Sequence, residues 1–308
     1  MEITTQHPLV SIAVIAYNSA EYILETLESI KAQTYDNIEL VVSDDCSTDG
    51  TVELCRKWID DHLSRFAAVH LLESPTNTGQ SGNYNRAFDA CTGEWIKEID
   101  GDDKLLPNCV SDFIEYTQKF AEAKYVFGKM IPFGSEVTCN DFYNEAYAFF
   151  GLSPEEQLHE LIYKGNSVPS PTSFYNRAYI IQKGFRNDER IPLLEDYPKW
   201  IKLLQLGVRF CFMDKEVVAY RVNSGISTQR RPSEAFHRSQ LLCDMYYRWP
   251  EWINNDEKDG MNRIVESQMK VYRQLLQSDA EVQRLQNTKA YRLGKIILKP
   301  FSVFKKQK

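Results

Sequence analysis

The sequence predicts an α/β protein built on a doubly wound, mostly parallel sheet with helices on both faces. Over the first hundred residues, short apolar runs alternate with longer amphipathic segments, which is the rhythm of strand, helix and strand. Polar clusters follow the apolar runs, at the ends where ligands bind in sheets of this kind. A chain of 308 residues with 43% apolar content also has ample material for the core of such a sheet.

The elements of the first third follow this rhythm. Four apolar runs have the length and composition of buried strands, namely 9–16, 38–43, 69–72 and 95–99. Amphipathic segments between them predict helices over 20–33, 51–66 and 79–91. Helical spacing of Ile23, Leu27 and Ile30 supports the first helix, and Ser47, Thr48 or Asp49 is expected to cap the second.

The remainder is less regular and predicts a C-terminal helical extension. An irregular stretch from about 133 to 173 ends in a Pro-rich loop over 169–172. A helix is expected from Glu195–Asp196 to about Leu206, followed by short strands over 209–213 and 216–220. Beyond Pro232 the chain reads as helical and charged through about Leu285. We therefore expect an α/β domain over 1–228, a helical region over 229–288 and a basic amphipathic tail over 289–308.

Composition and charge exclude several classes of protein. The net charge of -7 argues against general nucleic-acid binding. The 7 cysteines are scattered, with no Cys-x-x-Cys pair, which predicts neither a zinc site nor a disulfide framework and fits a reducing cytoplasm. No apolar run is long enough to span a bilayer, and the N-terminus lacks a signal-like segment.

The tetrapeptide Asp100-Gly101-Asp102-Asp103 directly follows the fourth predicted strand. Its carboxylates repel one another unless a cation lies between them, and a hard divalent metal such as Mg²⁺ or Mn²⁺ prefers oxygen ligands of this kind. Gly101 lets the backbone bend and leaves room for a large ligand. The alternative interpretation is an acidic turn that caps a helix starting near Leu105.

Two more polar clusters, Tyr17-Asn18 and Asp44-Asp45, end the first and second predicted strands. Because ligands bind outside the carboxyl ends of strands in doubly wound sheets, these clusters and the acidic tetrapeptide predict one site. Each cluster also has a structural alternative. Tyr17 would then be an ordinary strand-end aromatic residue, and the two aspartates an Asx turn before a helix.

Four segments occur in a recognisable order: Ala16-Tyr17-Asn18, residues 42–51, the Asn77-Thr78-Gly79 turn with Asn83 and Asn85 beyond it, and Asp100-Gly101-Asp102-Asp103. Together they resemble the motifs of the inverting nucleotide-sugar glycosyltransferases of family 2, which have the GT-A fold. The resemblance covers roughly residues 8–225. It implies metal-dependent transfer of a hexose from a nucleotide diphosphate donor, with UDP as the expected nucleotide, to a glycan acceptor.

The resemblance also implies roles for individual residues. Asp102 and Asp103 would face a Mn²⁺ or Mg²⁺ ion that neutralises the leaving diphosphate, with Asp100 nearer the ribose. Asp45, together with Asp44, would accept a hydrogen bond from the nucleobase. The other implied nucleotide-sugar contacts are Ala16, Tyr17, Asn18, Gly79, Asn85, Gly101 and Arg221. Arg86 could reach the base or a phosphate, although an exposed helix arginine is the simpler interpretation.

A general base is needed because the acceptor hydroxyl is a poor nucleophile. The segment Pro192-Leu193-Leu194-Glu195-Asp196-Tyr197 is similar to the family's Glu-Asp motif near the start of a helix. The resemblance implies that Asp196 is the base and that Glu195 supports the acceptor or the loop. The alternative is that both carboxylates simply stabilise the helix N-terminus through its dipole.

One segment departs from the family pattern. Many members carry Tyr-Arg-x-His, in which the histidine can help to hold the metal, whereas this chain has Tyr220-Arg221-Val222-Asn223. Asparagine offers a neutral oxygen, which is a weaker ligand for a hard metal. Asn223 is therefore implied as a metal ligand weaker than histidine, and Arg221 is either a phosphate partner or a surface ion pair.

The last twenty residues hold seven basic side chains and no acidic one, interleaved with aromatic and aliphatic residues. This pattern is typical of an interfacial segment on an anionic membrane surface, which would suit a lipid-linked acceptor and a peripheral location on the inner face of the cell membrane. The alternative is a tail that packs on the body or stays disordered. The preceding helices could bind the acceptor or pair subunits in a homodimer.

Two rival functions are considered. A nucleotidyltransferase should carry a glycine-rich phosphate loop after the first strand, where this chain has Ala16-Tyr17-Asn18-Ser19-Ala20. A non-catalytic nucleotide-sugar-binding or membrane scaffold protein would be indicated by loss of Asp102 or Asp196, and both are present.

Overall fold

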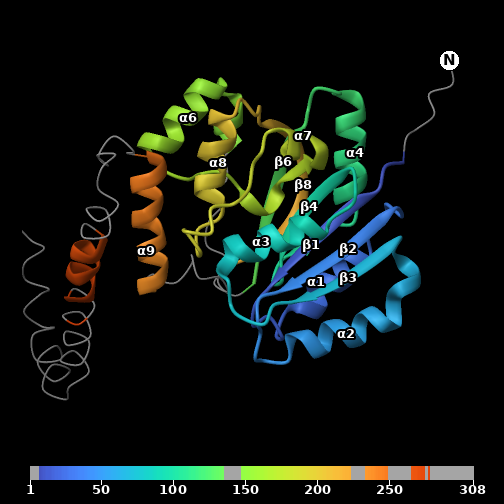
Figure 1. Cartoon of the computed structure of the whole chain (residues 1–308). Helices are drawn as coiled ribbons and strands as arrows, with labels where there is room; N and C mark the ends of the chain where they lie inside the picture. The colour runs from blue at the N-terminus through green and yellow to red at the C-terminus, as the bar shows by residue number, and fades with distance from the viewer. Residues whose placement is uncertain (1–6, 135–146, 223–232, 249–264, 275–276, 278–308) are drawn as a thin grey trace, which may run out of the picture. The chain divides into compact units, whose positions relative to one another are not determined.

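The computed structural model describes residues 7–134, 147–222, 233–248, 265–274 and 277. The chain divides into two compact units, Met1–Pro250 and Glu251–Lys308. In the second unit, residues 265–274 are helical. The first unit contains the sheet, and all further elements below belong to it (Figure 1).

Within the described residues, eight strands form one sheet in the order β3-β2-β1-β4-β7-β6-β8-β5. The strands are β1 (Val10–Ala16), β2 (Ile38–Asp44), β3 (Ala68–Glu73), β4 (Trp95–Asp100), β5 (Lys104–Leu105), β6 (Tyr125–Phe133), β7 (Phe174–Asn176) and β8 (Cys211–Arg221). Strands β3, β2, β1 and β4 are parallel, and so are β6 and β8. The short β7 is antiparallel to both β4 and β6, and β5 is antiparallel to β8. The predicted mostly parallel α/β fold is confirmed.

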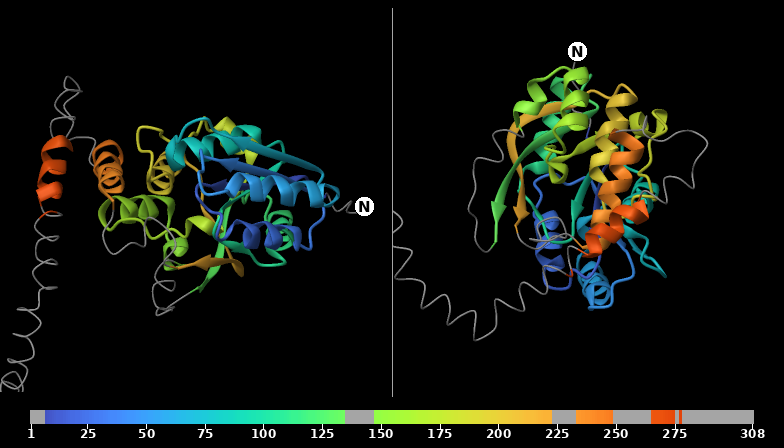
Figure 2. Two further views of the ribbon diagram at one scale, coloured as in Figure 1. Left: turned by 90° about the horizontal axis from the view of Figure 1, so that it is seen from below. Right: turned by 90° about the vertical axis from the view of Figure 1, so that its left-hand side faces the viewer.

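Helices cover both faces of this sheet (Figure 2). They are α1 (Ile23–Lys31), α2 (Thr51–His62), α3 (Gly79–Ala90), α4 (Cys109–Lys119), α6 (Pro154–Tyr163), α7 (Arg177–Gln182), α8 (Asp196–Gln205) and α9 (Glu234–Cys243). Short 3-10 turns span Leu63–Arg65, Phe149–Gly151 and Ser170–Thr172, and a π-helical turn over Asp244–Arg248 follows α9.

Alternate residues of the buried strands feed two separate cores, because successive side chains of a strand point to opposite faces. On one face, Val10, Ile12 and Val14 pack with apolar residues of α1, α2 and α4. On the other, Ala13 and Ile15 pack with residues of α3, α6 and α8. Strand β1 is therefore buried on both sides, which explains its continuous apolar sequence.

Three local predictions are corrected by the structure. The helix expected near Leu105 begins at Cys109, because Lys104 and Leu105 instead pair with β8 as a short strand. The two strands expected over 209–213 and 216–220 form the single strand β8. The N-cap position of α2 is held by Gly50 at φ 90°, although Asp49 Oδ1 still accepts a hydrogen bond from the Thr51 N–H.

The C-terminal predictions are tested only in part. Helix α9 begins at Glu234 after Ser233, whose side chain accepts a hydrogen bond from the Phe236 N–H, as expected of an N-cap. The predicted boundary at 228/229, Asn223 and the basic tail all lie outside the described residues. Among the helices of the described ranges, none combines the length and apolar character needed to cross a membrane.

Candidate active site

The three predicted polar clusters lie at one edge of the sheet. In the parallel register, Ala16 pairs with Asp44 across β1 and β2, and Ile15 pairs with Asp100 across β1 and β4. Residues that follow these pairs therefore leave the sheet side by side. The sequence prediction that Tyr17-Asn18, Asp44-Asp45 and Asp100–Asp103 share a location is confirmed at the level of the fold.

The loop after β2 is fastened to the turn after β1. Asn18 adopts a left-handed conformation at φ 49°, and its Oδ1 accepts a 2.9 Å hydrogen bond from the Thr48 N–H. The Asn18 N–H in turn donates to Ser47 Oγ, while Asp44 Oδ1 accepts from the Ser47 N–H. Tyr17 is left 48% exposed at this edge. Hydrogen bonds thus join the two strand ends, and the Tyr17 ring stays accessible to a ligand.

Asp45 connects these strand ends to the start of α3. Its Oδ2 accepts from the Thr78 and Gly79 N–H groups, and its Oδ1 accepts from Thr78 Oγ1 and the Arg86 guanidinium, at distances of 2.6 to 3.2 Å. Arg86 is thus a partly buried partner of Asp45 and not the exposed helix arginine of the simpler interpretation. Nucleobase recognition by Asp45 stays a prediction, and it would add to this structural role.

Gly79 packs closely against the segment that precedes α8. It has φ +79°, and a Cβ atom there would lie 2.6 Å from the Cβ and 2.7 Å from the carbonyl oxygen of Pro192. The Ser81 N–H also donates to the Pro192 carbonyl, and Ser81 Oγ donates to that of Ile191. The predicted nucleotide loop and the Glu195-Asp196 segment are therefore in direct contact.

Other residues predicted to contact the nucleotide make hydrogen bonds or close contacts within the protein. The Ala16 carbonyl accepts from the Asp45 N–H and from Asn83 Nδ2. Asn85 is buried and bonds to the segment 187–189 through both ends of its amide. Around Gly101, a Cβ would lie within 3.2 Å of Ser19 and Ile23 side-chain atoms. Their predicted contacts with a nucleotide sugar stay predictions.

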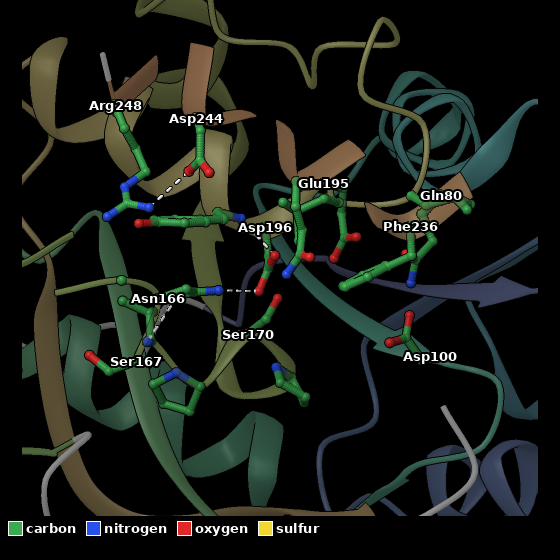
Figure 3. A pocket seen from close by; sticks show the side chains of 18 of the residues that line it. Gln80, Asp100, Asn166, Ser167, Ser170, Glu195, Asp196, Phe236, Asp244 and Arg248 are labelled. Carbon is green, nitrogen blue, oxygen red and sulfur yellow. Dashed lines mark hydrogen bonds and ion pairs between the residues drawn. The ribbon is translucent and has the colours of Figure 1, made fainter. Parts of the chain in front are cut away.

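Asp100 faces the same space as the Glu195-Asp196 pair (Figure 3). Its Oδ1 accepts a 2.8 Å hydrogen bond from the Tyr84 hydroxyl on α3, a partner that sequence reasoning missed. Burial and the neighbouring Asp102 charge raise the pKa of Asp100 to about 7. A carboxylate held at this edge is thus readily neutralised by a proton or a cation.

Hydrogen bonds connect the loop that carries Asp102 and Asp103 with Arg221 at the end of β8. Asp103 is buried, and its Oδ1 accepts a 2.8 Å hydrogen bond from the Arg221 N–H, whereas its Oδ2 has no hydrogen-bond partner among the described residues. The Arg221 guanidinium donates to the Asp102 carbonyl and forms an ion pair with Glu25 at 3.0 Å. Arg221 is therefore partly engaged by the protein itself.

The chemistry of this donor set suits a hard divalent cation. Burial and then the Asp102 and Asp100 charges raise the pKa of Asp103 well above its usual range, although the Arg221 N–H and the Lys97 charge oppose the rise. Among the described residues, no three His, Cys, Asp or Glu side chains are already gathered as a metal cluster. Asp102 and Asp103 are then the candidate ligands within the described chain, and Asn223 lies outside it.

A cavity of about 710 Å³ opens beside Asp100 and runs along α8 and α9. This volume falls within the range of about 300–1,000 Å³ found for small-molecule sites. Its wall comes from residues 165–171, from 193–197 and from the side of α9 with the following π-helical turn. Segments far apart in sequence therefore build one concave site.

Asp196 lies at the first position of α8 and points into this cavity (Figure 3). Asn166 Nδ2 donates a 2.7 Å hydrogen bond to its Oδ2, and the Tyr197 N–H donates a 2.6 Å hydrogen bond to its Oδ1. Burial raises the pKa of Asp196, and these two donors oppose that rise. Asn166 was missed by sequence reasoning because it lies in an irregular loop without any motif.

Glu195 lies beside Asp196 and does not cap the helix. It occupies the N-cap position of α8, but its side chain makes no capping hydrogen bond. Burial and then the Asp196 and Asp100 charges raise the pKa of Glu195 well above its usual range. The alternative in which both carboxylates stabilise the helix N-terminus through its dipole needs no capping hydrogen bond, and it stays an alternative.

A buried ion pair supports this wall of the cavity. Lys199, one turn further along α8, contacts Glu98 Oε2 of β4 at 2.6 Å, and both side chains are less than 10% exposed. The Tyr175 hydroxyl of β7 donates a 2.6 Å hydrogen bond to the other oxygen of Glu98. Because Lys199 forms an ion pair with Glu98, its positive charge offsets only part of the negative charge of an ionised Glu195.

Comparison with known proteins supports the motif-based resemblance. The family model described as Glycosyl transferase family 2 matches residues 11–185. The Escherichia coli enzyme WfaP, named UDP-Glc:alpha-D-GlcNAc-diphosphoundecaprenol beta-1,3-glucosyltransferase, is 27% identical over 236 residues, covering 76% of this chain and 85% of WfaP.

Solved structures resemble the fold. The S. aureus TarS 1-349 complex with UDP-GlcNAc superposes with a TM-score of 0.60 at 22% identity, covering 76% of this chain and 65% of that one. A longer TarS chain is covered to 38%, so this chain spans less than half of it. The Pyrobaculum calidifontis mannosyltransferase PcManGT, in complex with GDP-Man and Mn²⁺, gives a TM-score of 0.57 at 20% identity and covers 95% and 84%.

Proposed function

Because the chain belongs to glycosyltransferase family 2, we propose that it transfers a hexose with inversion from a UDP-linked donor to a glycan acceptor in polysaccharide biosynthesis. One observation carries this proposal. Asp100, from the end of β4, and Asp196, from the start of α8, line the same cavity although 96 positions separate them in sequence. The donor end and the acceptor end of a transfer reaction would meet there.

The reaction would proceed by a single displacement. Asp196, oriented by Asn166, accepts the proton of the acceptor hydroxyl as its oxygen bonds to the anomeric carbon. The bond from that carbon to the phosphate oxygen breaks at the same time, and the nucleoside diphosphate leaves. Inversion is carried over from the family resemblance, and a single displacement at the anomeric carbon inverts its configuration.

The donor would bind along the carboxyl edge of the parallel strands. Tyr17 offers an exposed ring for the base, and the loop held by Asp45 and Gly79 borders the nucleotide. Asp102 and Asp103 would hold a Mn²⁺ or Mg²⁺ ion, with Asn223 as a further ligand. Such an ion, when bound, supplies charge neutralisation for the diphosphate. PcManGT, whose structure contains GDP-Man and Mn²⁺, supports the metal by analogy of fold.

The acceptor is proposed to be a lipid-linked glycan. WfaP, whose name gives a diphosphoundecaprenol-linked acceptor, supports this class. The basic tail over 289–308 would then hold the enzyme peripherally on the anionic inner face of the cell membrane. A homodimer through the C-terminal helices is part of the same proposal.

The test is donor turnover by the full chain. Purified protein is incubated with a panel of nucleotide sugars and either Mn²⁺ or Mg²⁺, and release of the nucleoside diphosphate is measured for wild type and Asp102→Ala. We expect metal-dependent release from one UDP-sugar, lost in Asp102→Ala. Binding of a donor without turnover under any condition would instead favour the non-catalytic scaffold.

A further inference from the structure

The side chain of Glu195 is buried against the cavity. It is 7% exposed and lines the cavity together with Asp196 and Asp100. Figure 3 shows its carboxyl group directed toward the cavity space between Asp196 and Phe236. No hydrogen bond joins the Glu195 carboxyl to another residue in the described part of the chain. Its own backbone N–H and the Lys199 charge compensate in part, but the ionised form is still costly because burial removes its hydration.

The charges that face Glu195 make its ionisation still harder. Asp196 and Asp100 add negative charge, while the nearest cation, Lys199, is bound by Glu98. Tyr84, on α3, is neutral and donates its hydroxyl to Asp100.

The other charged side chains that line the cavity add little net positive charge near Glu195. His237, Asp244 and Arg248 also line the cavity, and Arg248 forms an ion pair with Asp244 at 2.8 Å. Burial lowers the pKa of His237, which keeps that ring neutral. The surroundings of Glu195 therefore favour its neutral form over its ionised form.

Asp196 differs from Glu195 because neighbouring residues donate hydrogen bonds to its carboxyl group. Two N–H groups, from Asn166 and Tyr197, point at its two oxygens and favour the ionised form. Of two adjacent carboxyl groups, one therefore accepts hydrogen bonds from neighbouring residues and, within the described part of the chain, the other does not. Pairs whose surroundings push them apart in this way divide acid and base roles between them.

We propose that Glu195 enters the reaction as a neutral carboxylic acid whose O–H donates a hydrogen bond to a sugar oxygen in the cavity, while Asp196 is the ionised base. This inference rests on the proposed function. The ligand chemistry is a hydroxyl-bearing sugar ring placed with one oxygen at Glu195 and its reacting hydroxyl at Asp196. A neutral acid positions the sugar without placing a second negative charge beside the base.

Carboxyl-to-amide replacements separate the two roles, because an amide keeps a hydrogen-bond donor but cannot accept the proton. Asp196→Asn should lower kcat for transfer by about 10²–10⁴-fold, as expected for loss of a general base. Glu195→Gln should lower it by less than about tenfold, because the amide N–H replaces the acid O–H. The matched control is Glu115→Gln, an exposed carboxyl on α4. An equally large loss in Glu195→Gln and Asp196→Asn would overturn the proposal.

The pH profile provides a readout that a purely structural role would not move. If Glu195 must be protonated, transfer falls as pH rises through its raised pKa, and this alkaline limb should be absent in Glu195→Gln. A limb that persists unchanged in that variant would count against the proposal.

A thermal melt tests the proton on Glu195 without any turnover. The raised pKa means that the native state binds more protons than the unfolded state once pH exceeds the unfolded value, so native stability falls as pH rises. Glu195→Gln removes this loss, and its Tm relative to wild type should rise as pH increases above about 4, the usual pKa of a glutamate. A constant Tm difference would refute protonation. Absence of donor turnover by the wild type, by contrast, would refute the proposed function. The melt would still show whether Glu195 is protonated in the native state.

Discussion

Removal of the Asn166 side chain should lower the fraction of Asp196 that is ionised at acidic pH without disturbing the donor site. The only hydrogen bond between a side-chain donor and the Asp196 carboxylate in the described residues comes from Asn166, at 2.7 Å. Asn166→Ala leaves the Tyr197 N–H as the remaining donor to Asp196. Since the lost bond favours the ionised carboxylate, the pKa of Asp196 should rise in the variant.

The expected size of the effect follows from the bond that is lost. Hydrogen bonds to charged groups contribute about 1.5–3 kcal/mol, and the lower end applies because Asn166 is exposed and water can replace part of it. About 1.4 kcal/mol corresponds to a factor of about ten. On the acid limb, kcat/KM for transfer should therefore fall by up to about tenfold, and the deficit should shrink toward higher pH.

The assay is the pH dependence of transfer from the best donor found, with donor KM measured alongside. Asn166→Ala should shift the acid limb to higher pH and leave donor KM within about twofold. Asn108→Ala, an exposed asparagine beside α4, is the control and should keep the wild-type profile. An unshifted acid limb in Asn166→Ala would refute the idea that this hydrogen bond supports the base.

Two further predictions concern the support of the site. Gly79→Ala combines a strained φ of +79° with a Cβ that would overlap Pro192, so it should cost about 1–3 kcal/mol of stability and lower transfer. Urea denaturation with the unhindered Gly151→Ala as control measures this, and equal stability of the two variants would contradict it. Lys199→Met leaves Glu98 buried and unpaired, which should cost about 3–5 kcal/mol in the same denaturation assay. The control is Lys164→Met, which removes a solvent-exposed ion pair with Glu160 and should lower the free energy of unfolding by less than about 1 kcal/mol. Similar losses of stability in both variants would show that the buried pair is not important.

The sequence predicts the parallel half of the sheet well, because its signals are local. Strands β1, β2 and β4 are buried on both faces and read as continuous apolar runs, and the polar residues that follow them mark the carboxyl edge. The start of α8 at Asp196 was likewise predictable from a family motif.

The remainder depends on tertiary contacts that no local pattern reveals. Strand β7 has three residues, and it pairs because β4 and β6 flank it. Strand β5 replaces an expected helix start because β8 supplies the pairing partner. Asn166 and Tyr84 reach Asp196 and Asp100 from segments 30 and 16 positions away, so their roles follow only from the folded geometry.

The central claim is that Asp196 removes the proton from the acceptor hydroxyl. The most direct measurement compares wild type and Asp196→Asn for donor binding and for transfer to a glycan acceptor. We predict donor affinity within about twofold of wild type together with a loss of transfer of about 10²–10⁴-fold. Transfer at the wild-type rate by Asp196→Asn would contradict the account, because the base would then have to lie elsewhere.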